Sequence, residues 1–414
     1  MSSDDEREFD LVLWGASGFT GCLVAHYLAS HDECAELDWA IAGRNEEKLR
    51  DVRSGLGDDF EDLPILLGDS FDRPSLDDIA AQTRVVCTTV GPYSEFGKEL
   101  VAACVEHGTD YCDLTGESHF VRQMIDAHHD TATEKGVRIV HCCGFDSIPS
   151  DLGTLMVQKE ALHRHGTPCD EVRFLIWKIR GGLSGGTITT IAQIMEEASG
   201  NREMRRNLGH PYALNPEGEQ SGPDGSFQRG PRREKELDAW SAPFMMAAIN
   251  EKIVRRTNAL LDYDYGKTFR YSEATHLGSG LPGAVRATTM SAGLGAFAAA
   301  LSLSPTRKLL QRFLLPSPGE GPSEETIEEG KFSIRLFGRG ADENGHPFEL
   351  VATVSADRDP GYGATAKMIG ESALCLAMDD VEDGLKGGVL TPASAMGSTL
   401  IDRLRRAGMT FDVQ

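Results

Sequence analysis

The chain has few lysines and no histidine pattern that suggests a metal site. Only 12 of its 41 basic residues are lysine, against 64 acidic residues, and its formal net charge is −23. This negative charge repels the phosphates of nucleic acids and argues against nucleic-acid binding. The twelve histidines show no ligand spacing, so we expect no bound zinc.

The cysteines show no pattern of a disulfide framework or a metal site. The nine cysteines are odd in number, none forms a C-x-x-C pair, and most lie in apolar strand or helix contexts. This is typical of reduced, buried cysteines in a cytosolic protein. Residues 1–8 are polar and acidic, so we expect no signal peptide and a cytoplasmic location. The length of 414 residues predicts two domains, and 40% hydrophobic residues suffice for sizeable cores.

The acidic, lysine-poor composition also leads to a first prediction, that the protein is halophilic. Dense carboxylates keep a protein soluble in salt, but they repel one another when salt does not screen them. We therefore expect the protein to unfold at low ionic strength and to recover in concentrated salt. Melting temperatures measured between roughly 0.1 and 3 M salt test this, because the Debye length shrinks steeply over that range. A melting temperature that does not change would contradict the prediction.

The strongest motif lies near the start, where residues 10–21 read DLVLWGASGFTG. This pattern predicts a strand, a tight glycine turn and then a helix. Gly15 permits the sharp turn, Gly18 allows a pyrophosphate to approach the backbone, and Gly21 allows the helix to pack on the sheet. The new helix directs free N–H groups at the phosphates. The alternative is an ordinary βα turn that happens to be rich in glycine.

A second feature concerns the choice of nucleotide. The strand expected at 39–42 is followed by Gly43, Arg44 and Asn45, where an NAD-preferring site usually carries Asp or Glu. A guanidinium at this place suits a 2′-phosphate, which predicts NADP. The alternative is that Arg44 is a solvated residue near the cap of the next helix.

Strands and helices alternate through the first 150 residues. Beyond the glycine turn, strands are expected at 63–69, 84–91, 110–114 and 137–142, and helices at 46–54, 76–82, 98–107 and 120–135. This alternation predicts an α/β fold with a Rossmann-type, doubly wound parallel sheet. Ligands of such sheets bind outside the carboxyl ends of the strands.

That rule selects the candidate site residues. Asp69 and Ser70 follow the third strand, near the expected adenine, and Thr89, Val90 and Gly91 follow the fourth, toward the nicotinamide. The full set predicted to bind the cofactor is Gly15, Ser17, Gly18, Phe19, Thr20, Gly21, Arg44, Asn45, Asp69, Ser70, Thr89, Val90 and Gly91.

Proton donors are expected at the same edge. Tyr93 is the first choice for the catalytic acid, with Asp146 and Glu117 as the alternatives. Structural roles compete with these assignments. Asp69 could cap a turn, Glu117 could start the helix at 118, and Ser150 and Asp151 could be N-cap residues.

The second half of the chain is less regular. We expect a strand at 171–179, a glycine-rich loop at 181–187, a helix at 188–198 and an exposed section at 215–233. An antiparallel pair at 331–337 and 348–357 and helices at 364–377 and 394–407 follow. The apolar stretch 290–303 and the basic, leucine-rich stretch 306–315 together are too broken to span a bilayer. They could lie on a membrane or line an acyl pocket. A buried core helix or a dimer-interface helix is the preferred alternative.

Five segments together resemble a known family: GASGFTG, AGRN, TTVGPYSEFG, DYCDLTGE and HCCGFDSIPSDLG. The first 155 residues resemble the saccharopine dehydrogenase-like oxidoreductases, most of all the branch with trans-acting enoyl reductases of lipid biosynthesis. A weaker similarity covers 387–393. The resemblance implies an NADP-binding Rossmann domain at 1–155, an inserted α+β substrate or dimerisation domain at 165–360, and a C-terminal segment, 361–414, whose helix returns to the Rossmann domain.

We therefore expect an NADP-dependent oxidoreductase. It would reduce an enoyl or isoprenoid C=C bond of an apolar, lipid-like small molecule held between the domains. The middle of the chain shows no evident set of residues for an amino-dicarboxylate. A saccharopine-type amino acid dehydrogenase, an NADP-sensing protein without turnover and a lipid-associated protein remain as alternatives. A homodimer and peripheral membrane contact through 290–315 remain open.

Overall fold

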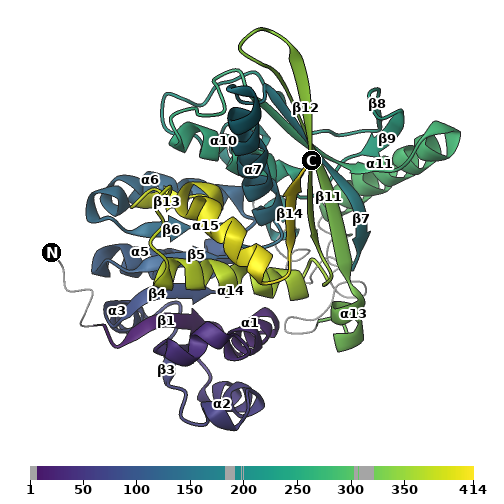
Figure 1. Ribbon diagram of the computed structural model, residues 1–414. Helices are drawn as coiled ribbons and strands as arrows, with labels where there is room; N and C mark the ends of the chain where they lie inside the picture. The colour runs from purple at the N-terminus through teal and green to yellow at the C-terminus, as the bar shows by residue number, and fades with distance from the viewer. Residues whose placement is uncertain (1–6, 182–191, 197, 199, 303–305, 307–320) are drawn as a thin grey trace. The chain divides into compact units, whose positions relative to one another are not determined.

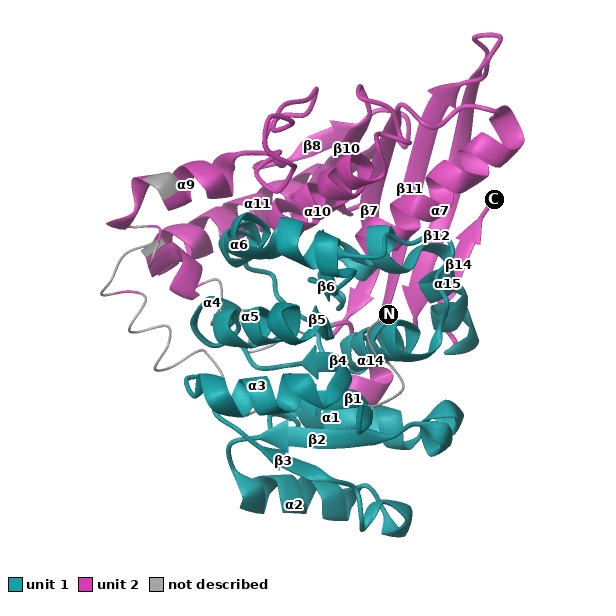
Figure 2. Ribbon diagram, turned by 90° about the vertical axis from the view of Figure 1, so that its left-hand side faces the viewer, with its two compact units in different colours: residues 1–148, 318–323, 361–407 teal, residues 149–317, 324–360, 408–414 magenta. Residues whose placement is uncertain are grey.

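The computed structural model describes residues 7–181, 192–196, 198, 200–302, 306 and 321–414, which form two compact units (Figures 1 and 2). Unit 1 comprises residues 1–148, 318–323 and 361–407, and unit 2 comprises 149–317, 324–360 and 408–414. Most of the predicted loop at 181–187, the start of the helix at 188–198 and most of 303–315 lie outside the described residues.

Unit 1 contains a parallel sheet in the order β13-β6-β5-β4-β1-β2-β3. Six of these strands have the 3-2-1-4-5-6 order of a Rossmann fold, so the predicted fold class is confirmed. The strands are β1 (Phe9–Trp14), β2 (Trp39–Gly43), β3 (Ile65–Leu67), β4 (Thr83–Thr88), β5 (Asp110–Asp113), β6 (Arg138–Val140) and β13 (Gly388–Leu390).

Helices cover both faces of this sheet, which explains why its central strands are almost continuously apolar and buried. Helices α1 and α14 pack together on one face, where α14 also contacts β1, β4 and β5, whereas α3, α5 and α6 form a contiguous row. The helices are α1 (Phe19–Ala29), η2 (Asp32–Glu36), α2 (Glu46–Gly55), η3 (Asp58–Phe60), α3 (Arg73–Ala81), α4 (Tyr93–Phe96), α5 (Lys98–His107), α6 (Ser118–Lys135), α14 (Gly363–Met378) and α15 (Pro392–Arg406).

The late segment α14–β13–α15 runs alongside the strands of the first 150 residues (Figure 1). Strand β13 extends the sheet by pairing with β6. The buried Arg403 of α15 binds Glu33 at 2.7 Å, Glu371 at 3.4 Å and Asp379 at 3.0 Å. These charge-assisted bonds join α15 to η2 and α14.

Unit 2 is built on a mixed sheet in the order β14-β12-β11-β7-β10-β9-β8, in which only β7 and β10 pair in parallel. The predicted antiparallel pair is β11 and β12, and β14 pairs with β12 rather than with unit 1. The elements are α7 (Ile148–His165), β7 (Glu171–Arg180), α9 (Arg202–Gly209), β8 (Arg232–Glu234), β9 (Ala239–Ala242), α10 (Ala247–Leu260), β10 (Arg270–His276), α11 (Gly280–Ser302), α13 (Glu324–Glu329), β11 (Lys331–Ala341), β12 (Pro347–Ala356) and β14 (Thr410–Val413).

Helix α11 differs from the sequence prediction. We expected residues 290–303 to form a buried core helix or a dimer-interface helix, but only 17% of the most apolar window of α11 is buried. The core-helix interpretation is therefore wrong for the described part. Leu281 and Val285 are 78% and 56% exposed. By length and composition alone, Gly280–Leu301 could cross a membrane.

Helix α10 buries an unusual number of charged residues. Arg255 binds Asp224 at 2.8 Å and Glu251 at 3.0 Å, whereas the neighbouring Glu273 receives hydrogen bonds only from neutral donors in the described structure. The Asn250 amide donates to Glu273 at 3.0 Å and the Tyr271 hydroxyl donates at 2.7 Å. Burial is the main cause that raises the pKa of Glu273 from 4.5 to about 7.

Glu273→Gln is therefore expected to change the pH dependence of stability. Because the folded pKa is raised, the wild type loses stability as pH rises from about 4.5 to about 7 and stays at the lower level above it. The glutamine oxygen can accept from the Asn250 amide while its NH₂ group donates to the Tyr271 hydroxyl oxygen, so both contacts persist without a charge. The variant should therefore gain up to about 3 kcal/mol over the wild type at pH 8 relative to pH 5. Unfolding measured at both pH values tests this, with the exposed Glu343→Gln as the control. If the free energies of unfolding of variant and wild type differed by the same amount at pH 5 and pH 8, the raised pKa of Glu273 would be contradicted.

Candidate functional site

The order of the strands reverses between β1 and β4, and the loops that follow these two strands touch. The Thr89 hydroxyl donates to the Gly15 carbonyl at 3.3 Å. Gly15 has φ +88°, and a Cβ atom there would overlap the Val90 side chain. Ligands of open α/β sheets bind at this kind of reversal point. The two predicted loops therefore lie together, as a dinucleotide site requires.

The other two glycines of the turn have separate roles. A Cβ atom at Gly21 would overlap the Gly15 carbonyl oxygen, so Gly21 allows the helix to pack closely. A Cβ atom at Gly18 would have one protein atom within 4 Å, the Gly15 oxygen at 3.3 Å. The space over Gly18 is thus open in the described structure.

Helix α1 begins directly after Gly18, and no side chain in the described structure caps its N-terminus. Its first turn contains no acidic residue. Ser17, Phe19 and Thr20 line this half-exposed turn, and the Phe19 ring packs edge-on against Tyr362 at 4.9 Å. Free N–H groups and an open approach are what a pyrophosphate needs. The turn therefore fits the diphosphate of NADP.

Beyond β2, Arg44 is exposed, and no ion pair or hydrogen bond is found for it within the described residues. Asn45 caps α2 by accepting a hydrogen bond from the Lys48 N–H at 3.0 Å. After β3, Asp69 accepts a hydrogen bond from the Phe71 N–H at 2.9 Å, and Ser70 is half-buried beside it. Asp69 thus has the turn role that competed with cofactor binding, and Asn45 caps a helix, whereas Arg44 remains available.

The geometry around Tyr93 makes this residue a poor proton donor. Its buried hydroxyl donates to the Thr88 carbonyl at 3.2 Å and accepts from the Leu114 N–H at 3.2 Å. Burial, followed by the charge of Asp113, raises the pKa of Tyr93 well above 10. Glu117 is buried too, and it accepts from the N–H groups of Tyr93 at 2.7 Å and Ser94 at 3.0 Å. Both side chains hold the loop that includes Gly91 in place.

Asp146 has a different environment. It is half-buried in the loop between β6 and α7, and it has no hydrogen-bond or ion-pair partner within the part of the chain that the structure describes. Burial, and then the negative charge of Asp113, raise the pKa of the Asp146 carboxyl from 3.8 to about 7. A carboxyl group of this kind can give up a proton at neutral pH.

Comparison with known proteins decides the family. Residues 11–140 match the family model described as the saccharopine dehydrogenase NADP binding domain. A Mycobacterium tuberculosis protein provisionally named a trans-acting enoyl reductase is 41% identical over 98% of this chain and 97% of its own. The trans-acting enoyl reductase of Mycobacterium ulcerans is 39% identical over 98% of each chain. The chain belongs to the saccharopine dehydrogenase-like oxidoreductases, in the branch of the trans-acting enoyl reductases.

This oxidoreductase uses NADP, as the glycine turn and Arg44 predicted. Its fold is shared with apo saccharopine dehydrogenase (L-Glu forming) from Saccharomyces cerevisiae, with a TM-score of 0.54 over 98% of this chain and 99% of that one. The sequence identity to the yeast protein is 14%.

Two polar residues at this edge, Asp113 and His141, are not among the predicted site residues. Asp113 ends β5 and His141 directly follows β6, and both are fully buried. The available signal was their position, because a polar residue at the carboxyl end of a buried parallel strand faces the ligand edge of the sheet.

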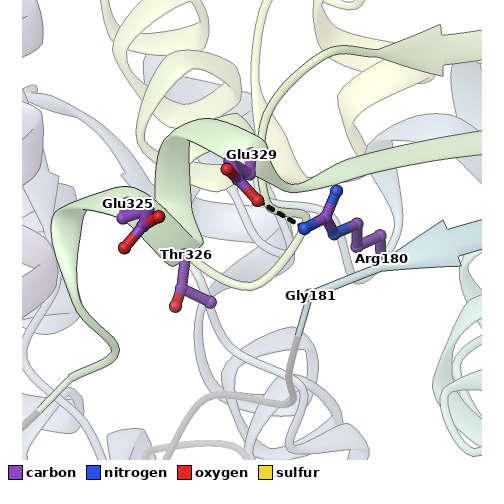
Figure 3. Close-up of a pocket in the computed structure, with 5 residues that line it drawn as sticks. All are labelled: Arg180, Gly181, Glu325, Thr326 and Glu329. Carbon is purple, nitrogen blue, oxygen red and sulfur yellow. Dashed lines mark hydrogen bonds and ion pairs between the residues drawn. The ribbon is translucent and has the colours of Figure 1, made fainter.

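A separate pocket in unit 2 is lined by Arg180, Gly181, Glu325, Thr326 and Glu329 (Figure 3). Its volume is about 130 Å³, and an ion pair joins Arg180 to Glu329. Cofactor pockets usually exceed about 300 Å³. This pocket is too small to hold a nicotinamide dinucleotide.

Arg44→Ala should lower the affinity for NADPH about 10- to 100-fold and change the affinity for NADH little. The expected loss corresponds to one charge-assisted contact with the 2′-phosphate. Calorimetric titration with both cofactors measures it. Arg50→Ala is the matched control, because Arg50 is an exposed arginine of α2 that pairs with Glu46. Equal losses for NADPH and NADH would refute the assignment.

Proposed function

We propose that this NADP-dependent oxidoreductase reduces the C=C bond of an enoyl group on an apolar, lipid-like substrate. The names of the full-length relatives support an enoyl substrate. The observation that carries the proposal is the Asp146 carboxyl, which is half-buried, lacks a partner in the described structure and has a pKa of about 7. Reduction of a C=C bond needs a proton as well as a hydride, and Asp146 can supply it.

Each part of the chain would have a defined task. Bound NADPH supplies the hydride. The backbone at Gly18 and the N-terminus of α1 bind its diphosphate, and Arg44 binds its 2′-phosphate. Asp146, protonated before the reaction, gives its proton to the carbon next to the thioester or carboxyl carbonyl. The carboxylate that remains takes a proton from water before the next turnover.

The buried contacts around the site would keep these groups aligned. Tyr93 and Glu117 fix the loop after β4 by bonds to backbone groups, so they hold Thr89, Val90 and Gly91 beside the glycine turn. Fixed geometry of this kind lowers the entropic cost of reaching the transition state. We assign Tyr93 and Glu117 a positioning role.

The apolar character of the substrate is supported by unit 2. Helix α11 has one charged residue, Arg286, over Gly280–Ser302, and most of its apolar surface is exposed. Acyl chains gain about 25 cal/mol per Å² of buried surface on such a helix. Contact with a membrane surface or with a second copy of the chain would use the same face, and both remain proposals. A cytoplasmic location fits a nucleotide-dependent dehydrogenase.

A saccharopine-type reaction is the second candidate, because the yeast saccharopine dehydrogenase has the same fold. The absorbance of NADPH separates the two, because it falls when an enoyl group is reduced and rises when saccharopine is oxidised by NADP. We expect turnover with long-chain enoyl thioesters, weaker turnover with a four-carbon enoyl thioester, and none when saccharopine is supplied with NADP. Turnover of saccharopine alone would overturn the proposal.

A further inference from the structure

The Asp113 carboxylate lies at the centre of a buried cluster where β5 and β6 end. One oxygen accepts hydrogen bonds from the Thr115 N–H at 3.0 Å and the Cys142 N–H at 3.1 Å. The other oxygen accepts from the Tyr111 hydroxyl at 3.0 Å and lies 2.7 Å from His141 Nδ1. Asp113 and His141 are both fully buried. All four bonds stabilise an ionised carboxylate.

The same residue fixes the backbone of the loop that carries Asp146. Asp113 binds the Cys142 N–H through its side chain, and its carbonyl accepts from the Cys143 N–H at 2.8 Å. Cys142 has φ +66°, a left-handed conformation that side chains other than glycine rarely adopt. Strained residues of this kind persist where the surrounding bonds over-determine them, often at functional sites.

His141 completes the arrangement. The contact of 2.7 Å to the carboxylate places an N–H on Nδ1 of His141. The other ring nitrogen, Nε2, is buried without a hydrogen-bond partner in the described structure. The Phe120 ring packs edge-on against this imidazole at 5.4 Å. The imidazole is thus held in one orientation.

We propose that Asp113 and His141 form a positioning pair, which holds the loop of Asp146 in its strained form. The inference rests on the proposed role of Asp146 as the acid. Asp113 acts through the backbone of Cys142 and Cys143, and through its negative charge, which disfavours a second negative charge nearby.

The other titratable groups at this edge do not replace Asp113 in that role. They are Tyr93, Tyr111, Cys112, Glu117, His119, Cys142 and Cys143. Burial raises the pKa of both tyrosines and of Cys142 and Cys143, so these four groups are neutral near pH 7. Asp113 is the one charged side chain among the described residues that contributes to the shift of Asp146.

Asp113→Asn tests the pair. The amide keeps an oxygen for the N–H groups of Thr115 and Cys142, but it directs an NH₂ group at His141. Nδ1 must then lose its proton and become the acceptor, which ¹⁵N NMR of the histidine ring detects. We expect the basic limb of the turnover profile to shift by about one pH unit toward acid, because the repelling charge is gone.

A second readout does not depend on turnover. The difference in stability between the wild type and the Asp146→Asn variant, followed against pH, reports the pKa of Asp146. That pKa should decrease when the same comparison is made with Asp113→Asn present in both proteins. If Asp113→Asn does not fold, Cys142→Gly takes its place, because glycine adopts φ +66° without strain. This variant should fold and bind NADPH normally, yet lose turnover about 10-fold as the loop of Asp146 loosens.

The outcomes separate the inference from the proposed function. Full turnover of Asp146→Asn would remove the proposed acid, and the inference with it. If Asp146→Asn is impaired while Asp113→Asn leaves the pH profile and the Asp146 pKa unchanged, the inference alone is overturned. If Cys142→Gly is tested instead, unchanged turnover would also overturn the inference alone.

Discussion

Gly18→Val is expected to abolish measurable NADPH binding while unit 1 stays folded. Among the described residues, a Cβ atom at Gly18 would have one protein atom within 4 Å, the Gly15 oxygen at 3.3 Å, so the backbone needs to adjust by a few tenths of an ångström. The valine methyl groups would instead fill the space over the N-terminus of α1, where the diphosphate binds. Losing several charge-assisted bonds should raise the dissociation constant by more than about 100-fold.

Gly21→Ala provides the contrast. Its Cβ atom would overlap the Gly15 carbonyl oxygen, which is backbone and cannot move aside easily. This variant should lower the melting temperature as well as the affinity. Calorimetry with NADPH and thermal unfolding without it separate the two effects. Unchanged affinity in Gly18→Val would remove the turn from the cofactor site.

Asp146→Asn is expected to lower turnover by about 10²- to 10⁴-fold, the usual contribution of a general acid. The affinity for NADPH should not change, because Asp146 follows β6 and lies outside the turn that binds the diphosphate. In the wild type, the acid is protonated below its pKa, so turnover should fall as pH rises through about 7. The Asp146→Asn variant should not show this decrease in turnover with rising pH.

Asp130→Asn, which changes an exposed carboxylate of α6, is the matched control and should behave as the wild type. Initial rates between pH 5.5 and 9, at saturating NADPH, provide the measurement. Wild-type turnover of Asp146→Asn would show that Asp146 is not the proton donor. Tyr93→Phe is informative beside it, because we expect this change to act on stability through the lost bonds to Thr88 and Leu114.

The local parts of the site could be predicted from the sequence. The turn at Gly15, Gly18 and Gly21 is encoded in twelve consecutive residues. The structure gives Gly15 and Gly21 a steric reason to be glycine, because a Cβ atom at either position would overlap neighbouring atoms. Arg44 follows from the same logic. The doubly wound parallel sheet follows from the alternation of strands and helices.

What could not be predicted depends on contacts between distant segments. Sequence position placed Tyr93 at the right edge of the sheet, but the bonds that occupy its hydroxyl come from Thr88 and Leu114. Strand β13 has three residues and pairs with β6 across 250 positions of the chain, so no local pattern reveals it. The exposure of α11 was missed because a short apolar run looks the same in a core as on a surface.

The central claim is that this protein transfers a hydride from NADPH to a carbon of an enoyl substrate. Transfer of deuterium tests it most directly: NADPH labelled at C4 of the nicotinamide, in each epimer separately, is incubated with a long-chain enoyl thioester and the product is analysed by mass spectrometry. We predict one deuterium on the former double bond, at the carbon farther from the carbonyl, from one epimer only. Two results together would contradict the account. The acyl chain would remain unlabelled with both epimers, and the label would instead be transferred to the imine formed from 2-aminoadipate semialdehyde and glutamate.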